Sequence, residues 1–283
     1  MKLGYTVWTW MNEEFGRGEN LTEFAKPHFE EAVRCISHLG YDVLENFNFT
    51  IFLYENNINE LKDLLEKYNL PLVNLYHSYS WVSGSDDYYF ELGERTCKFL
   101  QKMGAKHLNI QPGMWRDKPF FDRPTDVEML KKYVKLFNEM GRIAQSYGVT
   151  ACMHPHGQTH IFHENEVDFM VEHLDTDVVK LALDTGHTTL GGMDAVKAFD
   201  KYGDLIKYVH LKDANPNEHF DDEWPLHRLH ALGQGTVDFQ GVLRSLKKHN
   251  YDGVLCVEAD YPLVCNYETA QYCRNYCRDV LHI

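Results

Sequence analysis

The chain alternates without interruption between short β-prone runs and longer segments of helical character. The β-prone runs lie at Leu3–Val7, Asp42–Glu45, Leu72–Tyr76, His107–Gln111, Thr150–His154, Val179–Asp184, Tyr208–Lys212 and Val254–Glu258. Apolar residues at helical spacing mark the segments between and after them, at Phe29–Leu39, Ile58–Tyr68, Leu92–Met103, Val127–Tyr147, Val167–Leu174, Ala195–Tyr202, Phe239–His249 and Tyr267–Leu281. Strict β-then-α alternation predicts a parallel sheet. Because the composition shows no break along the 283 residues, we predict a closed (β/α)8 barrel, or TIM barrel, with residues 1–283 as its single domain.

Glycines mark several boundaries between a helical segment and the strand after it. Gly40, Gly104, Gly148 and Gly253 each follow a helical segment and precede a β-prone run. The residue just beyond a helix often has a left-handed backbone, which glycine adopts without a steric penalty. We therefore expect these four glycines to end helices in that conformation.

Composition excludes several classes of function. The net charge of −14 argues against nucleic acid as a partner, because phosphate-binding surfaces need clustered Lys and Arg. No apolar run approaches the roughly 18 residues of a membrane span, and the polar start of the chain does not resemble a signal peptide. The seven Cys form no CxxC pair and are odd in number, which is typical of reduced thiols. We expect a cytoplasmic protein that binds neither membranes nor nucleic acid.

Polar residues with metal-binding side chains end four successive predicted strands. His154, Asp184, His210 and Glu258 lie at or near the ends of the fifth to eighth runs. In a TIM barrel the carboxyl ends of the strands form the active site, so these residues are expected to lie together. Nitrogen and carboxylate ligands suit one divalent ion such as Mn, Co or Zn, with Fe or Mg as alternatives. The competing interpretation of each residue is an ordinary hydrogen-bonded group at a strand end.

Four segments of the second half resemble those of the xylose isomerase-like TIM-barrel superfamily of sugar isomerases, epimerases and dehydratases. They read LALDTGH at Leu181–His187, YVHLKDA at Tyr208–Ala214, GQGTVDF at Gly233–Phe239 and YDGVLCVEAD at Tyr251–Asp260. The resemblance implies that Asp184, His210 and Glu258 bind the metal, with His154 as a fourth ligand. It also implies that His187 faces substrate oxygens and moves protons, and that Arg228 contacts substrate. Relatives often form dimers or tetramers, so a homodimer or homotetramer is an open expectation.

The fifth strand departs from the pattern of the epimerases in this superfamily. Many relatives have Glu where this chain has His154, and two Glu residues there exchange the proton of a substrate carbon. The run from His154 to Thr159, which reads HPHGQT, looks more like the inosose dehydratase-like branch. This favours water elimination from a keto-inositol over ketose isomerisation or epimerisation. Whether His154 or His156 is the fifth-strand ligand is left open.

The chemistry expected of such a site is proton removal beside a metal-polarised carbonyl of a small keto-sugar or cyclitol. Glu258, His156 and His187 are candidates to carry protons, because a carboxylate can act as a base and the ordinary pKa of His lies near neutrality. Three residues at or beyond earlier strands, Glu45, His77 and Trp8, are candidates to contact substrate, with structural support as the equal alternative for Glu45 and His77. The long acidic and aromatic segment Asn215–Leu229 is predicted to be a lid or a dimer contact.

Two functions of other classes also fit a barrel. An endonuclease IV-like apurinic-site nuclease would need three zinc ions and more ligands. His77, Asp213 and His230 fit that pattern, but Gln111 and Arg228 stand where further ligands are expected. A non-catalytic sugar-binding barrel would not need a cluster of metal ligands. Both are less consistent with the sequence than a metal-dependent sugar enzyme.

Overall fold

The chain forms a closed barrel of parallel strands. The computed structural model describes residues 1–15, 25–82, 85–220 and 224–283. The barrel strands are β1 (Lys2–Thr6), β2 (Val43–Phe47), β3 (Leu72–Ser78), β4 (His107–Gln111), β5 (Thr150–Met153), β6 (Val179–Asp184), β7 (Ile206–Leu211) and β10 (Val254–Val257). Their order around the barrel is β1-β10-β7-β6-β5-β4-β3-β2, and β1 closes it by pairing with both β2 and β10. The predicted (β/α)8 fold is confirmed.

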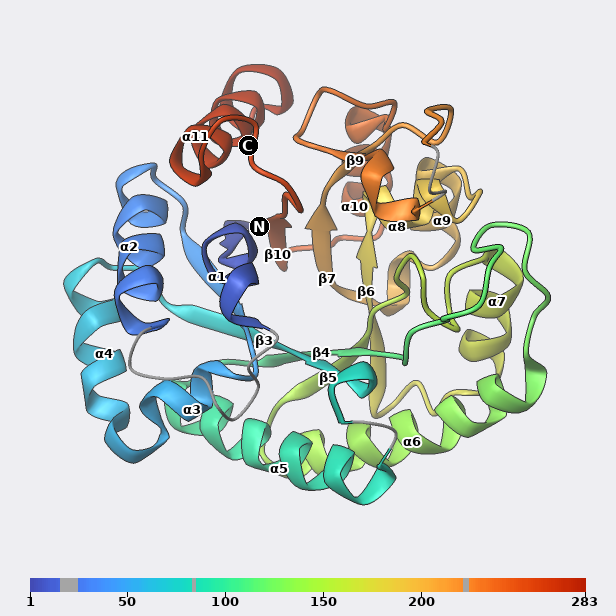
Figure 1. The fold of residues 1–283 in the computed structure, drawn as a ribbon, viewed down its shortest axis with the longest axis horizontal. Coiled ribbons are helices and arrows are strands. Elements are labelled where there is room, and N and C mark those ends of the chain that lie inside the picture. The colour runs from blue at the N-terminus through green and yellow to red at the C-terminus, as the bar shows by residue number, and fades with distance from the viewer. Residues whose placement is uncertain (16–24, 83–84, 221–223) are drawn as a thin grey trace.

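Helices surround the strands (Figure 1). Eight of them are α2 (Ala25–His38), α4 (Ile58–Lys67), α5 (Asp86–Met103), α6 (Val127–Ser146), α7 (Glu164–His173), α9 (Ala195–Lys201), α10 (Phe239–Lys248) and α11 (Asn266–Tyr276), which continues as a π-helical turn over Cys277–Leu281. All of them fall on the predicted helical segments. No helix in the described ranges is both long enough and apolar enough to span a membrane.

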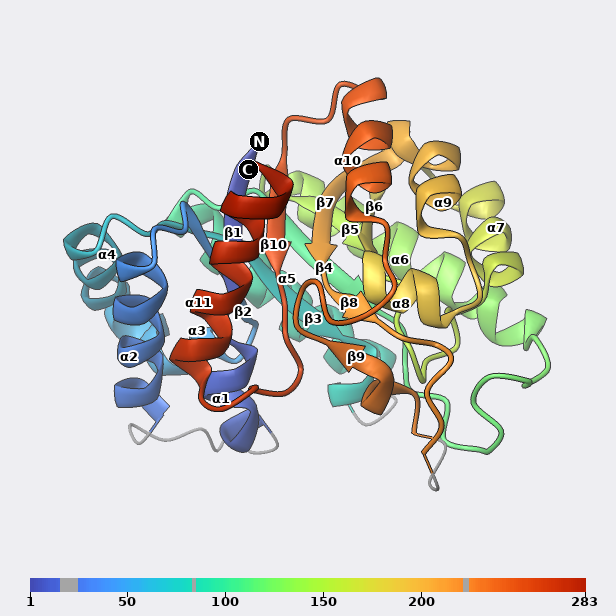
Figure 2. The ribbon, with the colours of Figure 1, turned by 90° about the horizontal axis from the view of Figure 1, so that it is seen from above.

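Several short elements were not predicted. They are α1 (Trp8–Phe15), α3 (Thr50–Tyr54), α8 (Thr185–Leu190), single 3-10 turns at Glu55–Asn57, Tyr79–Val82, Gly203–Leu205 and Pro225–Arg228, and the antiparallel ladder of β8 (Asp213–Ala214) and β9 (Leu229–His230). Most of them come directly after barrel strands, where they are too short to show a hydrophobic period. In Figure 2 the β8–β9 ladder lies beyond the tips of β6 and β7. Those that follow barrel strands lie at the end of the barrel where the polar strand ends meet.

Three of the four glycines that were expected to end helices have the predicted left-handed backbone. Gly40, Gly104 and Gly148 have φ of 79°, 73° and 69°, in the left-handed region. The expectation for Gly253 is wrong, because Asn250, with φ of 53°, takes the left-handed position after α10 instead. Asn tolerates that conformation better than other side chains, so the turn does not depend on glycine there.

The barrel interior is filled by side chains. Val43, Cys152, Ala182, Tyr208, Val254 and Cys256 form one buried apolar cluster contributed by five strands. A polar network shares the interior, in which Nδ2 of Asn74 lies 2.5 Å from a carboxylate oxygen of Glu45, and the backbone N–H of Asn109 donates to Oδ1 of Asn74 at 3.1 Å. A packed interior of this kind holds the strand ends rigidly. It therefore gives the side chains at the carboxyl end a fixed support.

Candidate active site and metal centre

Four side chains that the sequence predicts as metal ligands lie on four adjacent strands. His154 follows β5, Asp184 ends β6, His210 belongs to β7 and Glu258 follows β10. Asp184 and His210 are paired in register, and all four residues are buried, with Glu258 the most exposed at 8%. The barrel thus brings these four residues together at the carboxyl end of its strands.

The four side chains direct unpartnered polar atoms at one another. Nδ1 of His210 lies 3.2 Å from Oε2 of Glu258 and 3.8 Å from Oδ2 of Asp184. One ligand atom each of His154, Asp184 and His210 fall within 4.8 Å of one another. Within the described part of the chain, His154 Nε2 and these three atoms are buried without a hydrogen-bond partner, although Glu258 Oε2 also lies 3.2 Å from the ammonium of Lys212. Leaving such atoms unsatisfied is costly, and a divalent ion among them would satisfy all four. The donor set therefore fits a metal.

The opposite side of each of three ligands is fixed by a hydrogen bond. Nδ1 of His154 donates to the Ala182 carbonyl at 3.1 Å, which leaves Nε2 as the lone-pair nitrogen. Oδ1 of Asp184 accepts the backbone N–H of His187 at 2.8 Å, which leaves Oδ2 for the site. Nε2 of His210 lies 2.8 Å from Oε1 of Glu45. Hydrogen bonds of this kind orient metal ligands in known sites.

Glu45 therefore lies on the side of the His210 ring that faces away from the other proposed ligands. Its carboxylate is 1% exposed, contacts Nε2 of His210 and accepts from Asn74. Burial alone would lower the pKa of His210, but the carboxylates of Glu45 and Glu258 raise it to about 9. This placement favours the supporting role that the sequence left open for Glu45 over direct contact with substrate.

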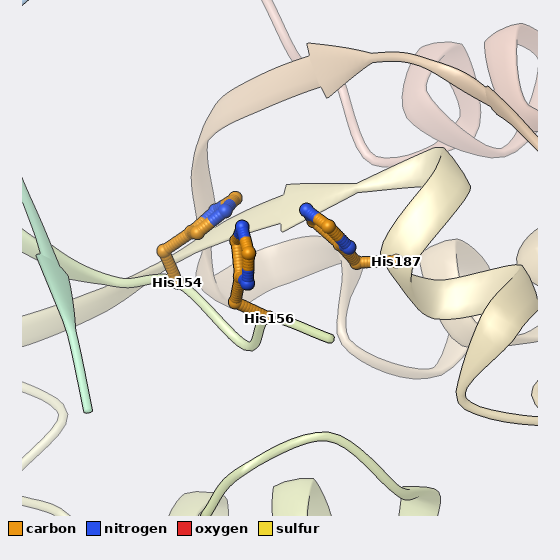
Figure 3. Close-up of side chains that lie close together, drawn as sticks. All are labelled: His154, His156 and His187. Carbon is orange, nitrogen blue, oxygen red and sulfur yellow. The ribbon is translucent and has the colours of Figure 1, made fainter. Parts of the chain in front are cut away.

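Three histidines face one another beside this centre. Figure 3 shows the rings of His154, His156 and His187 together, from the end of β5, the loop after it and α8. The ring centroids of His156 and His187 are 3.8 Å apart. Nδ1 of His156 donates to the Gly157 carbonyl at 2.6 Å, and burial lowers the pKa of His156 to about 4. A neutral His156 thus offers Nε2 as a proton acceptor. Since it is His154 that groups with Asp184 and His210, the geometry favours His154 as the fifth-strand ligand.

A cavity of about 360 Å³ opens in front of these residues. Its wall combines aromatic and apolar side chains (Trp8, Phe47, Tyr76, Met114, Trp224, Leu226) with polar ones (Ser80, Gln111, Arg116, His156, Gln158, Glu258, Asp260). Trp8, which the sequence offered as a candidate substrate contact, is part of this wall. Trp224 and Leu226 come from the predicted lid segment, of which residues 221–223 lie outside the described part. A small concave site with aromatic walls and a few polar groups suits a sugar-sized molecule.

Lys212 is a site residue that the sequence reasoning missed. It is fully buried, and its Nζ lies 3.2 Å from Glu258 Oε2, 3.2 Å from Asp260 Oδ1 and 3.4 Å from His187 Nε2. Burial alone would lower its pKa, but Asp260 and Glu258 raise that pKa well above the ordinary value. Lys212 follows His210 by two residues, and Asp260 follows Glu258 by two. The period of an extended strand was therefore the signal that could have found them.

Like Glu45 and His187, two further predicted substrate contacts, His77 and Arg228, are not among the residues that line the cavity. His77 is fully buried, with Nδ1 2.9 Å from Nδ2 of Asn48 and Nε2 3.1 Å from the Tyr89 carbonyl, and burial lowers its pKa to about 4. The guanidinium of Arg228 lies 4.5 Å from the Phe121 ring, and Nε donates to the Glu218 carbonyl at 2.5 Å. These contacts favour structural support for both residues.

The ligands that a trinuclear nuclease site would need are engaged elsewhere. Both ring nitrogens of His77 have partners, as described above. The carboxylate of Asp213 accepts four backbone N–H groups, from Ala214, Gly233, Gly235 and Val237, at 2.8 to 3.1 Å. His230 is paired with Glu218 at 2.8 Å. The geometry thus argues against the nuclease alternative.

Comparisons with known proteins match this chain to one family and to inosose dehydratases within the same size range. A family model described as xylose isomerase-like TIM barrel matches residues 33–272. The chain is 27% identical over 302 aligned residues to an inosose dehydratase of Clostridium beijerinckii, covering 99% of this chain and 97% of that protein. It is 26% identical to an inosose dehydratase of Geobacillus kaustophilus, covering 99% and 95%.

Solved structures with the same fold are more distant in sequence. The IolI protein with a bound zinc atom superposes with a TM-score of 0.76 at 19% identity, covering 99% of this chain and 98% of that one. The 3-keto-D-glucoside 4-epimerase YcjR of E. coli superposes with a TM-score of 0.73 at 20% identity, covering 99% of each chain. At these identities the likeness concerns the fold.

Proposed function

The chain belongs to the xylose isomerase-like TIM-barrel family, and on that premise we propose that it is a metal-dependent lyase that eliminates water from a keto-inositol or a closely related keto-cyclitol. As an enzyme of the sugar isomerase/epimerase superfamily, it is matched over nearly its whole length by inosose dehydratases. The observation that carries the proposal is the convergence of four buried ligand atoms without hydrogen bonds, contributed by four adjacent strands.

We assign the metal to His154, Asp184, His210 and Glu258. Two nitrogens and two carboxylate oxygens suit Mn, Co or Zn, with Fe as an alternative, whereas Mg prefers oxygen ligands alone. Burial and the neighbouring His210 hold the pKa of His154 well below its ordinary value, so His154 is neutral, as a metal ligand must be. A divalent ion held there would polarise the carbonyl of a keto-cyclitol and acidify the adjacent C–H.

Glu258 is the base in this mechanism. It is both one of the four proposed ligands and part of the cavity wall. Burial alone would raise its pKa, but Lys212 and His210 hold the pKa below its usual value, so Glu258 is ionised. Its carboxylate removes the proton from the carbon beside the carbonyl. The electron pair of that C–H bond becomes the new C=C bond while the C–O bond of the β-hydroxyl breaks.

His156 carries the proton from Glu258 to the departing hydroxide. Its Nε2 accepts a proton because Nδ1–H is held by the Gly157 carbonyl, and it lines the same cavity. The hydroxide then leaves as water and His156 returns to its neutral form, so the protons balance. His187, whose ring lies against that of His156, keeps the His156 ring in place, and its own Nε2 faces Lys212.

The site favours dehydration over epimerisation by two carboxylates, because among the described residues it lacks a second free carboxylate beside Glu258. The fifth-strand ligand is a histidine, so the pair of carboxylates found in epimerases is incomplete. The other carboxylate of the cavity, Asp260, is held by Lys212 at 3.2 Å. Trp8 and Phe47, whose rings are 5.2 Å apart, offer aromatic faces to the apolar face of a cyclitol ring.

The reaction is tested with protein stripped of metal by a chelator and reloaded with Mn, Co or Zn. Incubation with a keto-inositol is expected to give a product lighter by one water, with a new enone-type absorbance. Glu258→Gln should lose turnover while Glu128→Gln, a change on the exposed face of α6, should not. A product of unchanged mass and altered stereochemistry would replace the lyase assignment by an epimerase. Full turnover by the metal-free protein or by Glu258→Gln would remove the site assignment.

A further inference from the structure

A second cavity of about 530 Å³ adjoins the reaction cavity. The two share three lining residues, Ser80, Met114 and Arg116. The second cavity extends away from the proposed metal ligands, toward Tyr133 and His160. The two cavities therefore meet at these three side chains.

The segment that contributes Met114 and Arg116 to both cavities is held to the neighbouring loop by backbone contacts. Met114 forms an isolated antiparallel bridge with Thr159, and the Trp115 N–H donates to the Gln158 carbonyl at 2.7 Å. In extended backbone, residues two apart point to the same side. This explains why Met114 and Arg116 both line the two cavities.

The polar groups of the side cavity are mainly hydrogen-bond donors. The hydroxyl oxygen of Tyr133 accepts the Gly113 N–H at 2.8 Å, so its own O–H remains to donate. A Cβ at Gly113 would lie 2.6 Å from that oxygen, so a side chain at position 113 would displace the hydroxyl. Ser80 adds a hydroxyl, and Arg116 adds up to five N–H groups. A ligand that matches such a wall must be rich in acceptors.

The charge of the side cavity differs from that of the reaction cavity. Glu258 and Asp260 line the reaction cavity, whereas no Asp or Glu among the described residues lines the side cavity. Lys132 is matched by Asp86 at 2.8 Å. Arg116 is exposed, and within the described ranges no carboxylate lies within ion-pair distance of it. In a chain of net charge −14, this is a local excess of positive charge beside the site.

The geometry points to a two-part substrate: a keto-polyol ring at the proposed metal centre and an anionic group, phosphate or carboxylate, held by Arg116 in the side cavity. The guanidinium fork matches both groups with two parallel hydrogen bonds, and both are acceptors only, as the donor-rich wall requires. The assignment of the ring rests on the proposed function. The assignment of the anion rests on the side cavity alone.

The test measures binding rather than turnover, so that it does not depend on the reaction. Calorimetry on Mn-loaded protein compares myo-inositol with a myo-inositol monophosphate, and glucose with glucuronic acid. We expect at least one anionic probe to bind about ten-fold more tightly than its neutral partner, since hydrogen bonds to charged groups contribute that much. The phosphate and carboxylate pairs tell which anion is preferred.

Arg116→Gln should bring the affinity ratio close to one. Lys131→Gln, an exposed change on α6 paired with Glu128, should keep the wild-type ratio. Equal affinities in the wild type, no binding of either anionic probe, or a ratio that survives Arg116→Gln would overturn the inference. If the anion preference is found but keto-inositol is not dehydrated, the proposed function fails while the side cavity stands as an anion site.

Discussion

The carboxylate of Glu45 lies 2.8 Å from Nε2 of His210, on the side of the ring opposite to the Nδ1 that faces Glu258 and Asp184. The ring is thus held between a buried carboxylate and the proposed metal position. An acidic partner of this kind fixes the tautomer of the ligand and makes it more basic.

Glu45→Gln is therefore expected to weaken metal binding by about 10- to 100-fold while the fold is retained. The amide can still accept a hydrogen bond from His210 but no longer carries the charge. Competition with a chromophoric chelator measures the affinity. Glu128→Gln serves as the control, and an unchanged affinity in Glu45→Gln would show that this carboxylate does not support the ligand.

His154→Glu tests the branch of the family directly. Glu would add a third carboxylate to the site, and it would lose the donor that His154 directs to the Ala182 carbonyl. We expect the dehydration rate to fall by at least about ten-fold, because an anionic ligand in place of a neutral one would weaken the polarisation of the carbonyl by a bound metal, and changes around metal ligands typically cost about 10- to 100-fold in affinity or activity. The rate and the metal content are measured together. A full dehydration rate in the metal-loaded variant would contradict the role given to this histidine.

Lys212 and Asp260 form a buried pair whose members should depend on each other. Lys212→Met leaves the carboxylate of Asp260 without its cation, and breaking a buried pair in this way costs about 3–5 kcal/mol. The double change Lys212→Met with Asp260→Asn should cost less than the sum of the two single changes. Urea unfolding of metal-free protein gives all four values of the cycle. Additive costs would show that the two side chains are not coupled.

His77 predicts a pH dependence of stability. Its folded pKa is about 4 because of burial, whereas an unfolded His titrates near 6.5. Between these values the unfolded chain binds the extra proton, so stability falls as the pH decreases from about 6.5 to about 4, by about 3 kcal/mol in total. His77→Gln should flatten this slope in urea unfolding at a series of pH values. As a control, His28→Gln, at an exposed position, should leave the slope unchanged. An unchanged slope in His77→Gln would show that this ring is not the cause.

The sequence predicted the fold, and the meeting of four polar strand-end residues, through one rule. Parallel strands of a barrel present their carboxyl ends on one side, so polar residues at four strand ends had to meet, and the family resemblance drawn from the same segments is confirmed by the family match. The rule does not say which way a strand-end side chain points. Glu45 turns into the barrel toward His210, and His77 turns outward against Tyr89.

Other parts of the site depend on contacts between distant segments. Lys212 is buried among carboxylates from β6 and the segment after β10. Its two-residue spacing from His210 indicates the side of the strand on which it lies, but not these partners. Arg228 was placed near substrate by analogy, whereas the packing of Phe121 against it decides its position. The side cavity lies where the loop after β4 pairs with the loop after β5. Neither loop sequence by itself predicts that pairing.

The four backbone N–H groups collected by Asp213 have a consequence for how this enzyme can change. Three of them tie Asp213, just after β7, to the turn at Gly233–Val237, so both ends of the intervening stretch are anchored to the barrel by one side chain. Changing the length of a loop whose ends are already held costs little free energy. The stretch that supplies Trp224 and Leu226 to the cavity can thus vary in length and sequence to fit new substrates, without disturbing the four strands that carry the proposed metal ligands.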